Sequence, residues 1–206
     1  GNDSFLLESM HKKKGQNFLN DYVAYTVNST KCLGLKVINA GGAEFFKKGG
    51  ETFNLDDVVP SYGVSSRDIL TSLNKANEEL KIKHPLHVHC NNLGVPGNIK
   101  TILETIKTAE GRRMHLAHVQ FYGYDNKGKK GFSSGSVDLA DAVNKNKNIT
   151  VDVGQVMFKP TLTISSDVLR QFGARNNANP KKWIINEVED GGGGIIPYEY
   201  KKKKFC

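Results

Sequence analysis

The chain has 206 residues, which is enough to bury the core of one ordinary domain. Hydrophobic residues make up 38% of it, which excludes a disordered chain, and no apolar run approaches the length of a membrane span. The three cysteines, Cys32, Cys90 and Cys206, are too few and too scattered for a disulfide framework. We therefore expect a protein of a reducing compartment, by default the cytoplasm.

The net charge of +8 raises the question of a nucleic-acid partner. Much of this charge lies in two lysine runs near the ends, 12–14 and 201–204, and the other cations alternate with acidic residues. Charge runs are usually solvated surface, so we expect no nucleic-acid partner. The chain also begins without a methionine and stops near a lysine run, and we interpret it as a segment of something longer.

In chain order, the spacing of apolar residues predicts a regular alternation of helices and strands. A helix, a strand and a long loop to residue 64 are followed by three helix–strand pairs, so that the eight elements lie at 17–33, 35–39, 65–80, 86–90, 99–109, 114–121, 137–143 and 149–153. Ser65, Ser66 and Asp68 give the second helix a capping pattern. After Gln155 the pattern weakens to a short helix at 165–169, a strand at 183–185 and an unplaced glycine run at 191–194.

Four strands that alternate with helices predict parallel βαβ units, because each crossover needs a helix to return the chain to the same edge. The predicted fold class is α/β. Periodicity leaves two architectures open, the middle strands of a (β/α)8 barrel or part of an open doubly wound sheet. In both, ligands gather at the carboxyl ends of the strands, so polar residues there are the first candidates for a site.

Three predicted strands carry such residues. His89 ends the second strand, His118 lies in the third, and Lys36 lies in the first. A lone strand histidine is more often a hydrogen-bonded core residue, and a lone lysine can lie on an exposed face. On three successive βα units, however, a lysine carboxylated by carbon dioxide and two neutral imidazoles supply three ligands to zinc and leave a position for water. Such a zinc activates water and polarises carbonyls, which is the chemistry of amide bonds.

Two more histidines flank these candidates. His87 shares the strand face of His89 but lies deeper, and we expect it to be a core residue or to support a ligand. His115 lies at an odd spacing from His118 and is expected to face away. Cys90 has no second cysteine near it and is expected to be an ordinary small buried residue.

Polar residues around the strand ends are further candidates. Asn91, Asn92 and Gln120 are expected to contact substrate or support a metal ligand, with hydrogen bonding inside turns and strands as the alternative. Asp152 is a weaker candidate, because an acid at a strand end can either orient a ligand or cap the following turn.

Five motifs, in order, resemble the A subunit of formylmethanofuran dehydrogenase, a family placed with the amidohydrolases. They lie at 34–39 (GLKVIN), 87–98 (HVHCNNLGVPGN), 115–121 (HLAHVQF), 151–156 (VDVGQV) and 194–200 (GIIPYEY). The resemblance runs from about residue 20 to 202, and the second motif is long enough to be specific.

The resemblance implies a TIM-type barrel with a zinc pair bridged by a carboxylated lysine, matched by Lys36, and with one metal also held by the histidines that match His89 and His118. It implies condensation of formate with methanofuran to give formylmethanofuran, or the reverse, in the carbon dioxide reduction of methanogenesis. It also implies partner subunits that supply formate and carry a molybdenum or tungsten pterin and iron–sulfur clusters.

The family pattern is incomplete in residues 1–206. A histidine pair of the first barrel strand is expected before Gly1, and the aspartate of the last strand, the usual proton-transfer residue, after Cys206. Tyr122-Gly123-Tyr124 replaces a His-Ser-Tyr-type run, and Ala40 replaces a proline. We therefore interpret the whole chain as one partial barrel domain with part of a metal site, and expect it to be inactive alone.

Two rival functions stay open. Another metal-dependent amidohydrolase, such as one that opens a cyclic amide, would use the same ligands on a different substrate. A nucleic-acid-binding module would show affinity that falls steeply with salt. A non-catalytic fragment is the third possibility.

Overall fold

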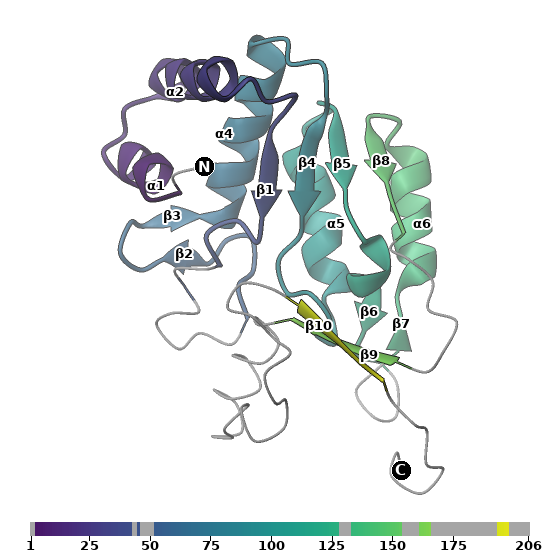
Figure 1. Cartoon of the computed structure of the whole chain (residues 1–206). Coiled ribbons are helices and arrows are strands. Elements are labelled where there is room, and N and C mark those ends of the chain that lie inside the picture. Colours follow the sequence, from purple (N-terminus) through teal and green to yellow (C-terminus); the bar gives the residue numbers. More distant parts are fainter. Residues whose placement is uncertain are drawn as a thin grey trace, which may run out of the picture.

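The computed structural model describes residues 3–42, 45, 52–127, 133–153, 161–165 and 193–197. Its centre is a four-stranded sheet in the order β1-β4-β5-β8 (Figure 1). The strands are β1 (Lys36–Ile38), β4 (Leu86–His89), β5 (Met114–Leu116) and β8 (Ile149–Val151). All three neighbouring pairs are parallel, so the predicted α/β class with parallel βαβ units is confirmed.

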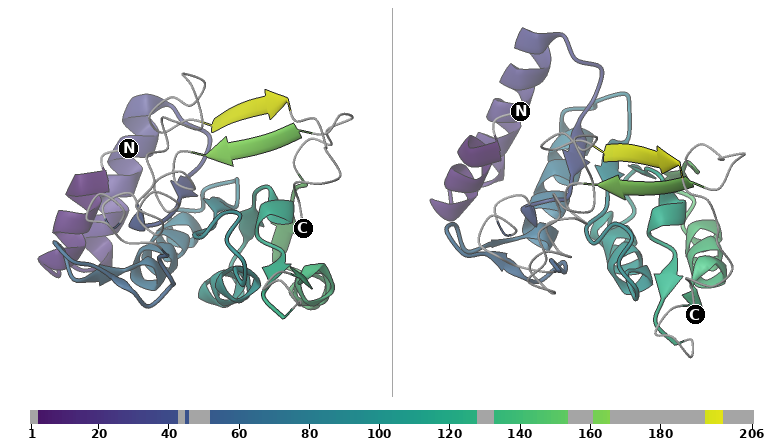
Figure 2. Two further views of the ribbon diagram at one scale, coloured as in Figure 1. Left: turned by 90° about the horizontal axis from the view of Figure 1, so that it is seen from below. Right: turned by 60° about the horizontal axis from the view of Figure 1, so that its bottom comes forward.

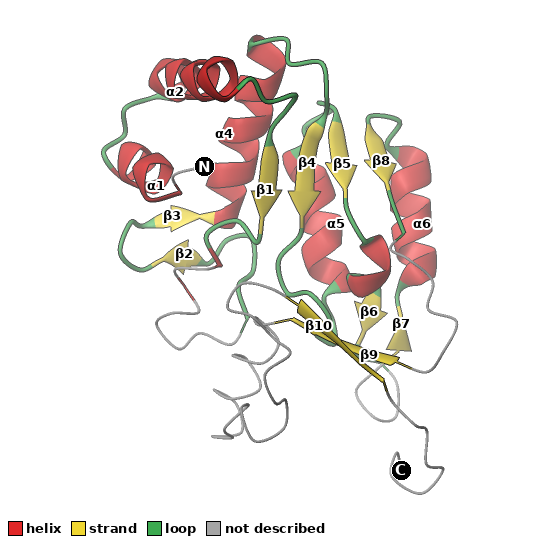
Figure 3. Cartoon of the chain, viewed as in Figure 1, coloured by secondary structure: helices red, strands yellow, loops and turns green. Residues whose placement is uncertain are grey.

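Three crossover helices connect these strands: α4 (Ser66–Glu79), α5 (Ile99–Thr108) and α6 (Ser136–Lys145). All three lie on the same face of the sheet, as Figures 2 and 3 show. The strand side chains that point towards them are apolar, and Leu86, Met114 and Leu116 are fully buried. Burying a side chain of this size stabilises the fold by roughly 1.5–3 kcal/mol, so this face holds the main core.

Smaller elements surround the sheet. Helices α1 (Asp3–His11) and α2 (Gln16–Thr30) precede it, and α2 packs on α4. A short turn η1 (Val119–Phe121) follows β5. Three antiparallel pairs complete the described part: β2 (Val58–Val59) with β3 (Val64–Ser65), β6 (Tyr124–Asp125) with β7 (Ser133–Ser134), and β9 (Thr161–Ser165) with β10 (Gly193–Pro197).

The start of α4 follows from its sequence. Ser65 Oγ accepts a hydrogen bond from the backbone N–H of Asp68 at 3.1 Å, and Asp68 Oδ2 accepts one from the N–H of Ser65 at 2.9 Å. This reciprocal capping box satisfies two backbone donors and stabilises a helix by about 0.5–2 kcal/mol. The predicted cap is confirmed.

The structure differs from the predictions in several places, and α1, β6 and β7 were not predicted. The third strand ends at Leu116 rather than at 121, because the chain leaves the extended conformation at His118, whose φ is 53°. The expected loop before residue 64 contains the β2–β3 pair, whose strands are too short to show alternation. Ser165, expected to cap a helix, ends β9. The rest of 165–169 and all of 183–185 lie outside the described residues.

None of the helices within the described ranges has both the length and the apolar character that crossing a bilayer requires.

Candidate functional site

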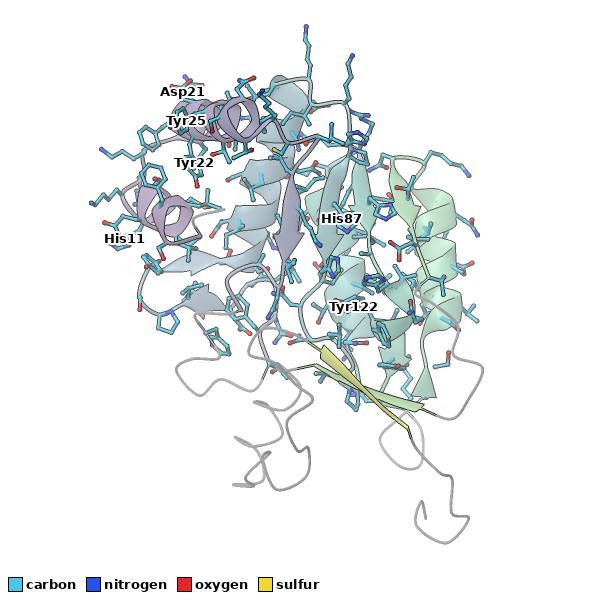
Figure 4. The ribbon with its side chains drawn as sticks, in the orientation of Figure 1. His11, Asp21, Tyr22, Tyr25, His87 and Tyr122 are labelled. Atoms are coloured by element: carbon cyan, nitrogen blue, oxygen red, sulfur yellow. The ribbon has the colours of Figure 1, made fainter. Side chains whose placement is uncertain are left out.

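The sheet face opposite the helices carries polar side chains. Residues in register on parallel strands point to the same side. Lys36 is in register with His87, His87 with His115, and His115 with Thr150, and we call these four residues the mid-strand row. Figure 4 shows His87 on the side of the sheet turned away from α5.

A second set lies nearer the carboxyl ends of the strands. It consists of His89, His118 and Asp152, which we call the carboxyl-end row. The ring centroids of His89 and His118 are 4.9 Å apart and the rings are nearly perpendicular, at 83°. The ring of His87 lies 5.2 Å from that of His89 and 5.0 Å from that of His115. The four histidines therefore form one continuous cluster across β4 and β5, which no single strand could provide.

His118 reaches this cluster because of its backbone. Strict alternation along an extended strand would place it on the opposite face from His115. Instead, His118 has a left-handed conformation with φ 53° and ψ 45°, which redirects its side chain to the polar face. The prediction that His115 faces away was therefore wrong. His115 and His118 share a face, because one left-handed residue breaks the period of two.

Asp152 connects these two histidines. Its Oδ2 lies 3.0 Å from His115 Nε2, and its Oδ1 accepts a hydrogen bond of 2.8 Å from the backbone N–H of His118. The same Oδ1 lies 3.1 Å from His118 Nδ1, at an angle outside that of a hydrogen bond. The hydrogen bond from His118, followed by that from His115, lowers the pKa of Asp152, so the carboxylate is charged at neutral pH.

The protonation of His89 suits a metal ligand. Burial, and then the positive charge of Lys36 and the neighbouring His118 and His87, lower its pKa from 6.5 to about 4. Burial is also the first cause of the lowered pKa of His87. Both rings are neutral at pH 7, which leaves a nitrogen lone pair for coordination. Within the described ranges, neither ring has a hydrogen-bond partner and Lys36 has no ion pair.

The cluster fits part of a metal site. Two imidazoles that bind one tetrahedral zinc at about 2.0–2.1 Å have ring centroids roughly 5 Å apart, which is close to the separation of His89 and His118. Across the described part of the chain, however, no three His, Cys, Asp or Glu side chains are grouped so that they could hold an ion. These residues therefore offer two imidazoles and the amine of Lys36, and a complete site needs ligands from elsewhere.

The loop after β4 is held by its own amides. Asn91 Nδ2 donates to the carbonyl of Phe53 at 3.2 Å and to Ser66 Oγ at 2.9 Å. Asn92 Oδ1 accepts from the N–H of Phe53 at 2.9 Å, and its Nδ2 donates to Thr101 Oγ1 at 3.1 Å. Both side chains are buried. These bonds correspond to the alternative of internal hydrogen bonding, and a substrate contact by either residue remains a prediction.

The other candidates are placed as follows. Gln120 lies half-buried in η1, directly after His118 and Val119. Cys90 is buried, which raises the pKa of its thiol to about 12 and makes it a poor thiolate ligand.

An open cavity of about 400 Å³ borders the mid-strand row. It is lined by Gly34, Leu35, Lys36, His84, Pro85, His87 and His115. His89 and His118 lie outside this lining, so the cavity is beside the carboxyl-end row rather than around it. Sequence reasoning missed the connection through Asp152, although positions 150 and 152 are two apart in a predicted strand and should share a face.

Comparisons with known proteins give the class first. No protein-family model matches the chain. The chain is 46% identical over 208 aligned residues to the A subunit of the formyltransferase/hydrolase complex Fhc of Methylorubrum extorquens, covering 98% of the chain and 38% of the relative. It is 35% identical over 194 residues to protein FwdA of Methanocaldococcus jannaschii, covering 88% of the chain and 34% of the relative. The class of protein that the chain resembles is thus the A subunit of a formyltransferase/hydrolase complex, as the first relative is named.

A solved structure agrees with these relatives. The X-ray structure of the formyltransferase/hydrolase complex FhcABCD from Methylorubrum extorquens, in complex with methylofuran, matches with a TM-score of 0.79 and 45% identity. The match covers 98% of this chain and 37% of that one. The chain is therefore homologous over most of its length to a segment of these proteins, which confirms the resemblance, and it spans a little over a third of their length.

Proposed function

We propose that this chain is part of a zinc-dependent formyl-transfer centre, in an A subunit that joins formate to the amine of methanofuran or reverses that reaction. The observation that carries the proposal is the cluster of Lys36, His87, His89 and His118 on one sheet face, in a chain homologous to such subunits.

A barrel of the amidohydrolase kind is the architecture that best accommodates this sheet. A doubly wound sheet has helices on both faces and a point where the strand order reverses. Here the strand order follows the chain without reversal, and α4, α5 and α6 all cover one face. In a closed barrel the opposite face becomes the interior, and the carboxyl ends of its strands carry the active site. We propose that residues 1–206 form part of one such domain.

Within that barrel, His89 and His118 would bind zinc through neutral imidazole nitrogens, and Lys36, carboxylated by carbon dioxide, would supply an anionic oxygen. When bound, the zinc would lower the pKa of a coordinated water and polarise the formyl carbonyl. The chain's own residues prepare this chemistry. Burial, the largest cause of its lowered pKa, keeps His89 unprotonated, and the left-handed backbone of His118 directs its ring to the same face.

The proposal needs further parts beyond these residues. We propose that a second zinc, its histidine ligands and a proton-transferring aspartate come from other segments of the same polypeptide. Other subunits of a formylmethanofuran dehydrogenase would supply formate and hold the molybdenum or tungsten pterin and the iron–sulfur clusters. Neither a membrane span nor nucleic acid has a role in the proposal.

A second candidate changes the amine and the direction. The relative at 46% identity belongs to a formyltransferase/hydrolase complex, and the solved complex binds methylofuran, whereas identity to FwdA is 35%. Hydrolysis of a formylated methylofuran-type amine by the same ligands is therefore the alternative. Assays of formyl release and formyl uptake with methanofuran and with methylofuran distinguish the two candidate functions. Activity only on cyclic amides would contradict both functions.

The test uses two histidine variants of the full-length subunit. His118→Ala removes one ligand and should abolish both zinc retention and formyl transfer. His11→Ala removes an exposed histidine at the end of α1, away from the central sheet, and should leave both unchanged. Elemental analysis and a formyl-transfer assay measure the outcome. Full activity and zinc content in His118→Ala would contradict the proposal.

A further inference from the structure

Asp152 contacts both His115 and His118. One carboxylate oxygen lies 3.0 Å from His115 Nε2, and the other accepts the backbone N–H of His118 at 2.8 Å. Its backbone is also fixed: its N–H donates to the carbonyl of Leu116 at 3.1 Å, and its carbonyl accepts from the N–H of Val119 at 3.0 Å. Asp152 is therefore hydrogen-bonded to Leu116, which precedes His118 in the sequence, and to Val119, which follows it.

His118 needs such support, because a left-handed backbone conformation costs roughly 1–2 kcal/mol for a residue with a side chain. The hydrogen bond from the N–H of His118 to Asp152 Oδ1 offsets part of this cost. If His118 relaxed into an extended conformation, its ring would turn to the helix-covered face. The separation of 4.9 Å from His89 would then be lost.

The carboxylate also selects one nitrogen of the His118 ring. Asp152 Oδ1 lies 3.1 Å from Nδ1, and Nδ1 is buried. The contact is not aligned as a hydrogen bond, but the negative charge of the carboxylate favours a proton on Nδ1, which leaves the lone pair on Nε2. Coordination by His118 would therefore occur through Nε2.

The far side of Asp152 is fixed as well. His115 Nε2 contacts the carboxylate, and His115 Nδ1 lies 2.9 Å from Thr150 Oγ1. Thr150 and Asp152 come from β8 and the residue after it, so the imidazole of His115 is held at both nitrogens by one chain segment. This arrangement prevents the carboxylate from rotating away from His118.

We propose that Asp152 is a positioning residue that holds His118 in its left-handed conformation with Nε2 free to coordinate. Thr150 and His115 hold the carboxylate in turn. The inference deepens the proposed function and rests on it for the identity of the metal, but the tautomer of His118 can be tested without metal.

The test compares Asp152→Asn with Asp141→Asn in the full-length subunit. The second variant makes the same change in charge away from the site, because Asp141 is an exposed acid on α6. Losing a carboxylate that supports a metal-ligating histidine weakens metal binding by about 10–100-fold. We expect that loss for Asp152→Asn and none for Asp141→Asn, measured by competition for zinc with a chromophoric chelator.

The second readout is the tautomer of His118, measured by ¹⁵N NMR on the histidine-labelled, zinc-free protein. We expect the proton on Nδ1 in the wild type and a mixture of tautomers in Asp152→Asn. A proton on Nε2 in the wild type would overturn the inference, and this result needs no variant that must fold.

The outcomes separate the inference from the proposed function. If the wild type binds zinc and the zinc affinity of Asp152→Asn is within twofold of that of the wild type, only the proposed role of Asp152 is contradicted. If the wild type binds no zinc, the proposed function fails, and the tautomer alone decides whether Asp152 positions His118.

Discussion

The two faces of the central sheet contrast in both composition and support. Towards the helices, Leu86, Met114 and Leu116 are fully buried in a continuous apolar core. On the other face, the rings of His87 and His89 have no hydrogen-bond partner among the described residues. The period of two along each strand thus places the apolar core on one face and the candidate metal ligands on the other. The following predictions test this division.

The largest effect is expected for Lys36→Arg on the polar face. A guanidinium stays cationic and cannot be carboxylated, so it cannot replace an anionic ligand. Formyl transfer by the full-length subunit should fall to background and its zinc content should decrease. Lys75→Arg on α4, where the lysine pairs with Glu79, is the control and should behave as wild type. Normal zinc content in Lys36→Arg would exclude Lys36 as a ligand.

The helix-covered face should respond in stability instead. Leu116→Ala leaves a cavity at a fully buried position and should destabilise the protein by about 2–5 kcal/mol, as measured by urea denaturation. Because Leu116 points away from the histidines, zinc affinity under native conditions should be unchanged. A loss of zinc affinity without a loss of stability would contradict the assignment of separate roles to the two faces of the sheet.

Asn92 tests whether the loop after β4 serves the fold or the substrate. Asn92→Ala removes a buried amide that bonds the N–H of Phe53 and Thr101 Oγ1, and should cost about 1–3 kcal/mol of stability. Thr101→Val removes only one of these partners and should cost less. If Asn92→Ala instead raises KM with little change in stability, Asn92 contacts the substrate.

The last prediction is a pH dependence at His89. Its pKa is lowered to about 4, so the unfolded chain takes up a proton more readily than the folded one. Stability of the zinc-free protein should therefore decrease as pH falls below 6.5, and the decrease should level off near pH 4. Lys36→Met should raise the pKa of His89 in an NMR titration, because the positive charge of Lys36 is one cause of the shift. An unchanged pKa of His89 would show that the charge of Lys36 does not act on this ring.

Much of the fold could be predicted because its elements have clear periods. The strands around Val37, Val88 and Leu116 and the stripe of α5 follow from apolar spacing alone. The end of β5 could not be predicted, because nothing in the run 115–121 indicates that His118 adopts a left-handed conformation. For the same reason the shared face of His115 and His118 was missed. The family resemblance assigned ligand roles to Lys36, His89 and His118, and these roles stay predictions.

The pairing register of the strands places Lys36 and the proposed histidine ligands in different rows. Lys36 is aligned with His87 in the mid-strand row, whereas the proposed ligands His89 and His118 lie in the carboxyl-end row. The lysine side chain is long enough to reach either row, so the position of the metal decides between two ligand sets.

The most direct test is an anomalous difference map at the zinc edge from crystals of the full-length subunit. The proposed site predicts a peak within about 2.0–2.2 Å of His118 Nε2, of a nitrogen of His89 and of an oxygen on carboxylated Lys36. The absence of a peak on this face of the sheet, or a peak bound by His87 and His115 instead, would contradict it.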